Sequence, residues 1–203
     1  MTEKYMKTIQ FETDGDIYHP LPLLGGNGKV WIPSNITSNF FNSAYYANGL
    51  WVAGGTDVGL WYSIDGKVWT QSNITSGTFN SVYYSNGIWV AAGIDDNGLW
   101  YSTDGQNWTQ SNITSDYFNS IYYGNGLWVA GGSGLYYSED GKNWTQSNIT
   151  SGAFYSIHYA NGLWVACSAA VLYYSESSDG SILQVVNGEW AVVAVTNAEE
   201  VEY

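Results

Sequence analysis

The chain is built from short stretches in which apolar and polar residues alternate with a period of two, the period of a β-strand. Within residues 79–84, Phe79 and Tyr83 fall on one face of such a strand, and Val82 and Tyr84 fall on the other. β-Branched and aromatic residues, which fit a pleated surface, dominate these stretches. The pattern therefore predicts strands rather than helices.

One phrase occurs four times along the chain. It is close to W-x-x-S-N-I-T-S-x-x-F-N-S-x-Y-Y-x-N-G-L-W-V-A-G-G, followed by a variable stretch and by L-W-Y-S-x-D-G. The copies begin at Trp31, Trp69, Trp108 and Trp144, 36 to 39 residues apart. A fixed period in this range is typical of repeat proteins in which each copy is one supersecondary unit. Length varies between V-A-G-G and L-W-Y-S, so this stretch is predicted to be a loop.

Two tight turns are predicted in each copy. An Asn-Gly pair supplies the two residues with positive φ that a type I′ hairpin turn requires, and it occurs at 48–49, 86–87, 125–126 and 161–162. An Asp-Gly pair after the L-W-Y-S segment predicts a second turn. Each copy is therefore predicted to form four short antiparallel strands.

Both faces of these strands carry apolar or aromatic residues, so each sheet must be covered on two sides. A ring of sheets, each packed between two neighbours, meets this requirement. The predicted fold is therefore all-β, a β-propeller of four-stranded antiparallel blades in a single domain spanning 1–203. The clear repeats are assigned to residues 31–66, 69–105, 108–141 and 144–180.

Closure of the ring is predicted to use both ends of the chain. Residues 181–203 repeat the order strand, Asn-Gly turn, strand in a degenerate fifth unit. N-terminal strands within 5–34 are predicted to supply a missing strand, which leaves no unpaired edge. The prediction is thus a propeller of five blades. The alternative is an incomplete ring that is completed by oligomerisation.

The chain holds 18 acidic residues against five lysines and no arginine, a net charge of −13. So few cations cannot neutralise a phosphate backbone, and neither nucleic acid nor an anionic membrane is an expected partner. The sequence shows no apolar secretion signal and no window apolar enough for a membrane span, so no membrane insertion is expected. The single cysteine, Cys167, excludes an internal disulfide and is predicted to be a small buried residue in a strand.

Three segments begin with Ser and carry Asp-Gly two residues later, at 63–70, 102–109 and 138–145. They resemble the Asp-box turns of sialidase-type (BNR) propellers, although they are about one residue shorter between the Asp and the aromatic residue. The resemblance covers about 150 residues and implies that Asp65, Asp104 and Asp140 hold the turns together rather than catalyse. Sialidases that resemble this fold hold a substrate carboxylate with several arginines, so a chain without arginine is not expected to have that activity.

No catalytic constellation recurs among the copies, and the protein is predicted not to be an enzyme. A glycoside hydrolase needs two carboxylates across a cleft. The loop acids predicted to face one rim are Asp57, Asp95, Asp96 and Asp116, and no pair of them recurs. A glycoside hydrolase without arginine-based chemistry is kept as an alternative. Motifs of nucleophilic hydrolases, phosphate loops and zinc proteases are absent from the sequence, which predicts no metal site and no cofactor.

The loop that joins the fourth strand of one copy to the first strand of the next is rich in amide, hydroxyl and aromatic groups. Such groups bind sugars, because amides bind the hydroxyls and aromatic rings cover the C–H faces. Similar weak sites around one rim gain avidity through multivalency. The candidate ligand-binding residues are Asn35, Thr37, Asn42, Asn73, Thr75, Asn80, Asn112, Thr114 and Asn119.

The predicted function is therefore a multivalent, non-enzymatic module that binds a carbohydrate or a cell-surface receptor. The alternative for the nine residues is that the loop bonds its own backbone, as Asn, Ser and Thr side chains often do. An assay for glycan binding separates the two interpretations.

The opening segment 5–11, followed by an acidic turn, is similar to the N-termini of tail-associated proteins from phages and prophages of gut Firmicutes. This resemblance covers fewer than 20 residues. It implies a receptor-binding propeller on a virion, with other virion proteins as partners, and a purely structural role in the particle is the alternative. Without that resemblance, a cytoplasmic location is expected.

Overall fold

The computed structural model describes Gly28, residues 30–37, 39–94 and 97–175, and the backbone of strands in 12–13, 16–17, 181–186 and 189–195. The chain divides into two units, Met1–Pro33 and Ser34–Tyr203. In the first unit, β1 (Glu12–Thr13) pairs antiparallel with β2 (Asp16–Ile17). The second unit contains the sheets of the repeats. Among the described residues, no helix is long and apolar enough to cross a membrane.

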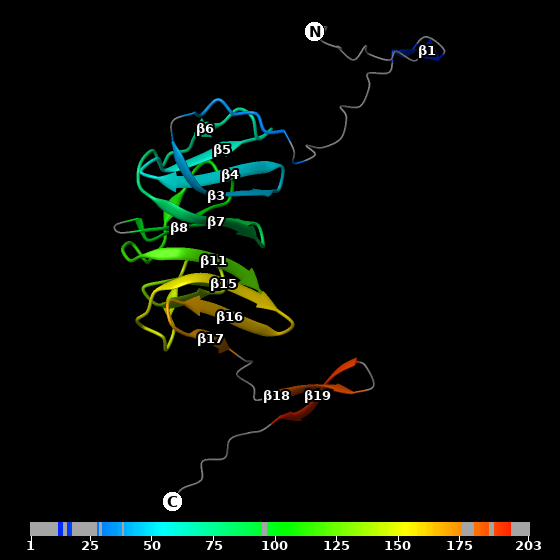
Figure 1. The fold of residues 1–203 in the computed structure, drawn as a ribbon, viewed down its shortest axis with the longest axis vertical. Helices are drawn as coiled ribbons and strands as arrows, with labels where there is room; N and C mark the ends of the chain where they lie inside the picture. Colours follow the sequence, from blue (N-terminus) through cyan, green and yellow to red (C-terminus); the bar gives the residue numbers. More distant parts are fainter. Residues whose placement is uncertain are drawn as a thin grey trace, which may run out of the picture. The chain divides into compact units, whose positions relative to one another are not determined.

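Each of the first three sheets has four antiparallel strands that neighbour one another in chain order (Figure 1). Sheet 1 consists of β3 (Phe40–Ala47), β4 (Leu50–Thr56), β5 (Leu60–Ser63) and β6 (Thr70–Gln71). Sheet 2 consists of β7 (Phe79–Ser85), β8 (Ile88–Gly93), β9 (Leu99–Ser102) and β10 (Thr109–Gln110). Sheet 3 consists of β11 (Phe118–Gly124), β12 (Leu127–Gly132), β13 (Leu135–Ser138) and β14 (Thr145–Gln146). The prediction of four short antiparallel strands is confirmed for these three sheets.

Sheet 4 has three strands in the part of the chain that the structure describes, namely β15 (Phe154–Ala160), β16 (Leu163–Ser168) and β17 (Leu172–Ser175). A separate hairpin of β18 (Ser181–Val186) and β19 (Glu189–Val195) follows. Its backbone pairs Val185 with Trp190, as sheet 2 pairs Tyr84 with Trp89. The remainder of the predicted fifth unit 181–203 and most of the segment 5–34 lie outside the described residues, so five blades stay a prediction.

The Asn-Gly turns have the predicted backbone conformation. The four asparagines have φ between 49° and 51°, and the glycines that follow them have φ between 77° and 81°. Both positions lie in the left-handed region that a type I′ turn requires. The turn chemistry of the sequence therefore sets the register between the first and second strand of each sheet.

The four sheets stack face to face in chain order, and their first strands β3, β7, β11 and β15 lie side by side (Figure 1). Phe79 of sheet 2 packs so closely on sheet 1 that a Cβ added to Gly54 would lie 2.7 Å from the Phe79 Cβ. Phe118 and Phe154, the equivalent side chains of sheets 3 and 4, are also fully buried. Burial of one such side chain stabilises the fold by about 1.5–3 kcal/mol, so these contacts hold consecutive sheets together through separate apolar clusters.

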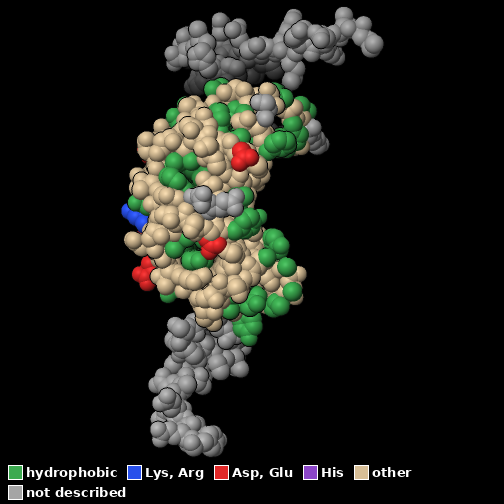
Figure 2. Space-filling view, turned by 90° about the vertical axis from the view of Figure 1, so that its left-hand side faces the viewer, with side chains coloured by type: hydrophobic (Ala, Val, Ile, Leu, Met, Phe, Trp, Pro, Cys, Tyr) green, Lys and Arg blue, Asp and Glu red, His purple; other side chains and the backbone are tan. Residues whose placement is uncertain are grey.

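Within the described residues, sheets 1 and 4 lie at opposite ends of the stack (Figure 1). Apolar side chains are exposed at both ends, Phe40 and Phe41 on β3 and Leu172 and Tyr174 on β17. Apolar side chains also gather along one edge of the stack, and few charged groups interrupt the surface in this view (Figure 2). The described sheets therefore form an open stack.

Two residues with reactive side chains occupy ordinary strand positions. His158 pairs with Val165 across sheet 4, as Tyr83 pairs with Val90 in sheet 2. Cys167 pairs with Ser156 and is free, but it is half-buried rather than buried as predicted. The reason is its place in the end sheet, since no further described sheet covers sheet 4.

Candidate functional site

Three turns connect the third and fourth strands of sheets 1 to 3 and are here called the Ser–Asp turns; they span residues 63–69, 102–108 and 138–144. In the second, the Ser102 Oγ accepts a hydrogen bond from the Gly105 N–H at 2.8 Å. The Asp104 Oδ1 accepts from the N–H groups of Gln106 and Asn107, both at 2.8 Å. The other two turns repeat these three bonds at 2.8 to 2.9 Å. Each carboxylate thus closes its own turn.

These contacts favour the ionised carboxylates. Burial of Asp104 opposes ionisation, but hydrogen bonds from Asn107 and Gln106 outweigh it and lower the pKa of Asp104 to about 2. The same balance lowers the pKa of Asp140, and backbone hydrogen bonds within its turn lower the pKa of Asp65. A carboxylate that stays ionised and is bonded within its turn is poorly suited to act as a general acid.

Each Ser–Asp turn ends in a tryptophan that packs on the preceding sheet where one is present. The Trp108 indole N–H donates to the Gly105 carbonyl at 3.2 Å, and the side chain is 3% exposed. It packs in one cluster with Leu50 and Val52 of sheet 1. Trp144 is equally buried in the cluster between sheets 2 and 3. The turns therefore seal the contact between consecutive sheets.

Three of the predicted ligand-binding asparagines, Asn35, Asn73 and Asn112, hold these turns in place. The Asn73 Oδ1 accepts from the Trp108 N–H at 2.8 Å, and its Nδ2 donates to the Trp108 carbonyl at 3.0 Å. Asn35 and Asn112 make the same pair of bonds to the tryptophans of the first and third turns. Each side-chain amide therefore forms the pair of hydrogen bonds that a neighbouring strand would form, with the backbone of a tryptophan 32 to 35 residues away.

The other three predicted asparagines, Asn42, Asn80 and Asn119, form a ladder across the first strands. The Asn80 Nδ2 donates to the Phe118 carbonyl at 3.1 Å and to the Asn119 Oδ1 at 3.2 Å. Asn42 bonds Asn80 in the same way at 3.2 Å, and Asn119 donates to the Phe154 carbonyl at 2.8 Å. Each ladder residue lies in a bulge of its strand. These amides are engaged between sheets.

The three predicted threonines, Thr37, Thr75 and Thr114, are exposed to solvent. The loop beneath Thr75 is braced by the Gln71 Nε2, which donates to the carbonyls of Thr75 at 3.0 Å and Val58 at 3.2 Å. Thus the six amides have partners inside the protein, whereas the three hydroxyl positions are accessible. A role of the nine residues in ligand binding stays a prediction.

An aromatic column, which the sequence interpretation did not single out, follows the first strands through Tyr45, Tyr83, Tyr122 and His158. Successive ring centroids lie 4.7, 5.2 and 4.5 Å apart. Burial, together with the neighbouring Tyr45 and Tyr122, raises the pKa of Tyr83 above its ordinary value. The sequence does place an aromatic ring at this same position of the phrase in all four copies. Only the stacking of the sheets brings these rings together.

The two described rim acids, Asp57 and Asp116, accept hydrogen bonds from side chains of the protein itself. Thr78 donates its hydroxyl to the Asp57 Oδ1 at 3.3 Å. The Tyr136 hydroxyl donates to the Asp116 Oδ2 at 2.8 Å, and burial together with Asp116 raises the pKa of Tyr136 to about 12. Asp95 and Asp96, the other two predicted rim acids, lie outside the described residues.

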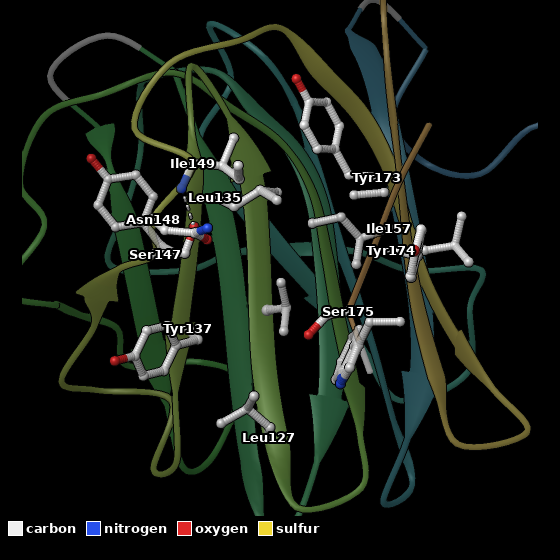
Figure 3. A pocket seen from close by; sticks show the side chains of 15 residues that line it. Leu127, Leu135, Tyr137, Ser147, Asn148, Ile149, Ile157, Tyr173, Tyr174 and Ser175 are labelled. Carbon is white, nitrogen blue, oxygen red and sulfur yellow. Dashed lines mark hydrogen bonds between the residues drawn. The ribbon is translucent and has the colours of Figure 1, made fainter. Parts of the chain in front are cut away.

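A cavity of about 320 Å³ lies between sheets 3 and 4 (Figure 3). Leu127, Val129 and Trp164 supply apolar walls, and Asn148 and Tyr174 also line it. The cavity is not lined by any of the nine predicted residues. Its walls can accommodate an apolar or aromatic group.

No protein-family model matches the chain, and no curated protein matches it. Solved structures do resemble it. The computationally designed Ika4 protein matches over 70% of this chain and 94% of its own, with 10% identity and a TM-score of 0.56. The extracellular domain of BT4673 from B. thetaiotaomicron matches over 83% of this chain and 23% of its own, with 13% identity and a TM-score of 0.58.

The designed Ika8 protein matches over 74% of this chain and 47% of its own, with 9% identity and a TM-score of 0.50. The chain thus spans less than half of Ika8 and less than a quarter of the BT4673 chain. At these identities the likeness concerns the fold alone. Together with the stacked antiparallel sheets, it shows that the chain has the all-β fold of a propeller, as predicted.

Proposed function

We propose that this propeller is a non-enzymatic module that binds neutral glycans through several weak, similar sites. The observation that carries the proposal is a row of exposed hydroxyl pairs, here called the hydroxyl rim: Thr75–Ser76, Thr114–Ser115 and Thr150–Ser151. Each pair lies in the loop from the fourth strand of one sheet to the first strand of the next. The same chemical group is therefore offered at successive steps of the stack.

The loops of the hydroxyl rim are held by hydrogen bonds before any ligand binds. In the first loop, the Ile74 N–H donates to the Ser72 Oγ at 3.0 Å, and the Ile74 carbonyl accepts from the Leu60 N–H at 2.9 Å. The Gln71 side chain also donates hydrogen bonds to the carbonyls of Val58 and Thr75, which holds the same loop. A loop that is already ordered loses little conformational entropy on binding, which favours even a weak ligand.

The chemistry of the rim suits a neutral sugar. Hydroxyl side chains both donate and accept hydrogen bonds, as sugar hydroxyls do. Tyr117 and Tyr155 follow the second and third hydroxyl pairs closely in sequence and are 43% and 58% exposed, so their rings are available to sugar C–H faces. Asp116 follows the second hydroxyl pair in the same loop, Asp57 lies in the loop between β4 and β5, and both disfavour anionic ligands.

The proposal of a binding module rather than an enzyme is supported by the carboxylates. Those of the Ser–Asp turns are ionised and bonded within their turns, and the chain has no arginine with which to hold an anionic sugar. An assay over a panel of chromogenic glycosides tests the hydrolase alternative. Turnover that disappears in Asp95→Asn or Asp96→Asn would contradict the proposal.

A glycan array with the protein displayed multivalently tests binding itself. The test variant combines Thr75→Ala, Thr114→Ala and Thr150→Ala. Loss of about 1 kcal/mol at each site weakens each site about fivefold, and loss of avidity lowers the multivalent signal by on the order of a hundredfold or more. The matched control combines Thr70→Ala, Thr109→Ala and Thr145→Ala, which remove exposed threonines from the fourth strands of the same sheets.

Binding of a neutral glycan that is lost in the test variant and retained in the control supports the proposal. An array without any binder removes it, as does equal binding by both variants. A receptor on a host cell surface and a place on a virion are further parts of the proposal. Residues 5–11, which carry the resemblance to phage proteins, lie outside the described residues, so pull-down with host cell wall is the appropriate test.

A further inference from the structure

The aromatic column brings tyrosines of consecutive sheets into direct ring contact. The ring centroids of Tyr45 and Tyr83 lie 4.7 Å apart with an angle of 37° between the planes, and those of Tyr83 and Tyr122 lie 5.2 Å apart at 42°. Elsewhere in the part of the chain that the structure describes, the tyrosine rings that contact another ring pack on tryptophan or phenylalanine. Among the described residues, the pairing of two phenol rings is thus a feature of this column.

Hydrogen bonds between the first strands hold these rings next to each other. The Val82 N–H donates to the Ser43 Oγ at 3.1 Å, which joins β7 to β3. The Ile121 N–H donates to the Ser81 Oγ at 3.3 Å, which joins β11 to β7. Each donor directly precedes a column tyrosine in the chain, and the asparagine ladder joins the same strands a second time. The rings therefore stay paired without any ligand between them.

Paired phenol rings react with each other when both are oxidised. A one-electron oxidant takes an electron from a phenol and the hydroxyl proton leaves to water, which gives a tyrosyl radical with spin density on the carbons next to the C–O carbon. When the neighbouring ring is oxidised as well, two such carbons form a C–C bond. Each of these carbons then loses its hydrogen as a proton while each oxygen regains one. In total, two tyrosines give up two electrons and two protons and become one dityrosine.

Buried tryptophans next to the column direct oxidation towards it. The Trp89 ring meets Tyr45 edge-on, with centroids 6.2 Å apart, and the Trp128 ring meets Tyr83 in the same way at 6.0 Å. An oxidised indole takes an electron from a nearby phenol, which loses its proton in the same event. Burial, together with the neighbouring tyrosines, raises the pKa of Tyr83, so its ring is a protonated phenol at neutral pH. Oxidation of the surrounding tryptophans therefore ends on the column tyrosines.

We infer that Tyr45, Tyr83 and Tyr122 form an oxidative cross-linking site, at which a one-electron oxidant joins the first strands of consecutive sheets through a dityrosine bond. Rotation about χ2 of a tyrosine is soft, so the rings can turn until the two carbons meet while the strands stay in place. The fourth position of the column is occupied by His158, whose centroid lies 4.5 Å from that of Tyr122. An imidazole forms no dityrosine, so the site consists of two tyrosine pairs that share Tyr83.

Such a cross-link supplies a covalent tie between sheets that this chain cannot obtain from cysteine. The sequence contains one cysteine, so no internal disulfide can form. Tyr45 and Tyr83 are 38 residues apart, and a bond between them closes a loop of that length in the unfolded chain. By the loop-entropy relation for disulfides, a loop of this length lowers the unfolding equilibrium constant by on the order of several hundredfold. Oxidation would thus make the stack more resistant to unfolding.

Photo-oxidation of the full chain tests the cross-link. Visible light acting on tris(bipyridine)ruthenium(II) with persulfate generates ruthenium(III), a one-electron oxidant. The product that keeps the 22.4 kDa mass of a single chain is isolated by denaturing electrophoresis, and its dityrosine is measured by fluorescence. The wild type is expected to form dityrosine within single chains, with a yield that does not depend on protein concentration, because both rings belong to one chain.

Digestion with trypsin locates the cross-link, because the chain contains few lysines and no arginine. Cleavage after lysine releases the large peptides 30–67, 68–142 and 143–203. A bond from Tyr45 to Tyr83 joins the first two of these peptides. A bond from Tyr83 to Tyr122 stays within the second peptide, whose mass falls by two hydrogens. Mass spectrometry therefore distinguishes the two tyrosine pairs.

Conservative variants assign the reacting rings. Tyr83→Phe removes the ring that both pairs share and should lose nearly all single-chain dityrosine. Tyr84→Phe is the matched control and should keep the wild-type yield, because the ring of Tyr84 packs on Trp89. Tyr45→Phe should abolish the bond between peptides 30–67 and 68–142 but keep the bond within 68–142.

A gain of cross-linking provides a second test that does not depend on removing a ring. His158→Tyr places a phenol at the fourth position of the column and should add a bond that joins peptides 68–142 and 143–203. Absence of this new bond contradicts the inference. A wild type without single-chain dityrosine overturns it, and so does a yield that is unchanged in Tyr83→Phe or that rises in proportion to protein concentration.

Discussion

Replacing Asn73 by alanine tests whether the side-chain clamp on the Ser–Asp turn stabilises the contact between sheets. The amide makes two hydrogen bonds to the Trp108 backbone, at 2.8 and 3.0 Å. A typical intramolecular hydrogen bond contributes about 0.5–1.5 kcal/mol net, so losing both should cost about 2 kcal/mol. The Trp108 side chain is buried, but its turn is near the surface, and water can replace part of the loss.

Amide hydrogen exchange measured by NMR is the appropriate assay, because a repeat protein can open locally without unfolding as a whole. A loss of about 2 kcal/mol corresponds to exchange of the Trp108 amide about 30 times faster. The Trp144 amide makes the same bond to Asn112 and serves as an internal reference. Thr75→Ala, in the same loop, is the matched control and should leave the exchange rates unchanged.

Two results would refute this reasoning. Unchanged exchange at Trp108 would mean that the clamp contributes nothing measurable. An equal acceleration at Trp108 and Trp144 would mean that the whole stack had been destabilised, so that the effect could not be assigned to one turn.

Two glycine substitutions and the pH dependence of one turn give further predictions. Gly105→Ala should lower the free energy of unfolding by about 2–4 kcal/mol, because φ is 70° and the new Cβ would lie 2.6 Å from Leu50. Gly87→Ala should lower it by only about 1–2 kcal/mol, since φ is 80° but no atom lies within 4 Å of the new Cβ; urea unfolding of both variants measures the difference. The folded pKa of Asp104 is lowered, so its contribution to stability is present above the unfolded value of 3.8 and is lost as the pH falls towards about 2. The stability difference between wild type and Asp104→Asn should therefore shrink between about pH 4 and pH 2, and a difference that stays constant in urea titrations over this range would contradict the assignment.

Much of the fold could be predicted because the signals are local. An Asn-Gly pair requires positive φ at both residues wherever it occurs in a hairpin, and the four turns have that conformation. Alternating apolar residues on both strand faces required a sheet on either side, and the stack provides one for sheets 2 and 3. Closure into five blades stays a prediction, because it depends on the angle between sheets and not on any single residue.

The candidate site was less predictable. Asn73 and Thr75 were both expected to bind a ligand, since both are polar residues of the same loop. The structure bonds the amide of Asn73 to Trp108 and leaves Thr75 exposed. The difference lies in a partner 35 residues away, and no local pattern indicates which polar group that partner will take.

By itself the sequence determined the repeat, the hairpin turns and the four-stranded unit, because the information for each is contained within one copy. The tertiary structure decided what lies between copies: the asparagine clamps, the aromatic column, and the cavity next to Asn148. The physical reason is that these features form where two sheets meet. A contact between sheets depends on how two copies pack, and near-identical copies acquire different surroundings when one of them ends the stack.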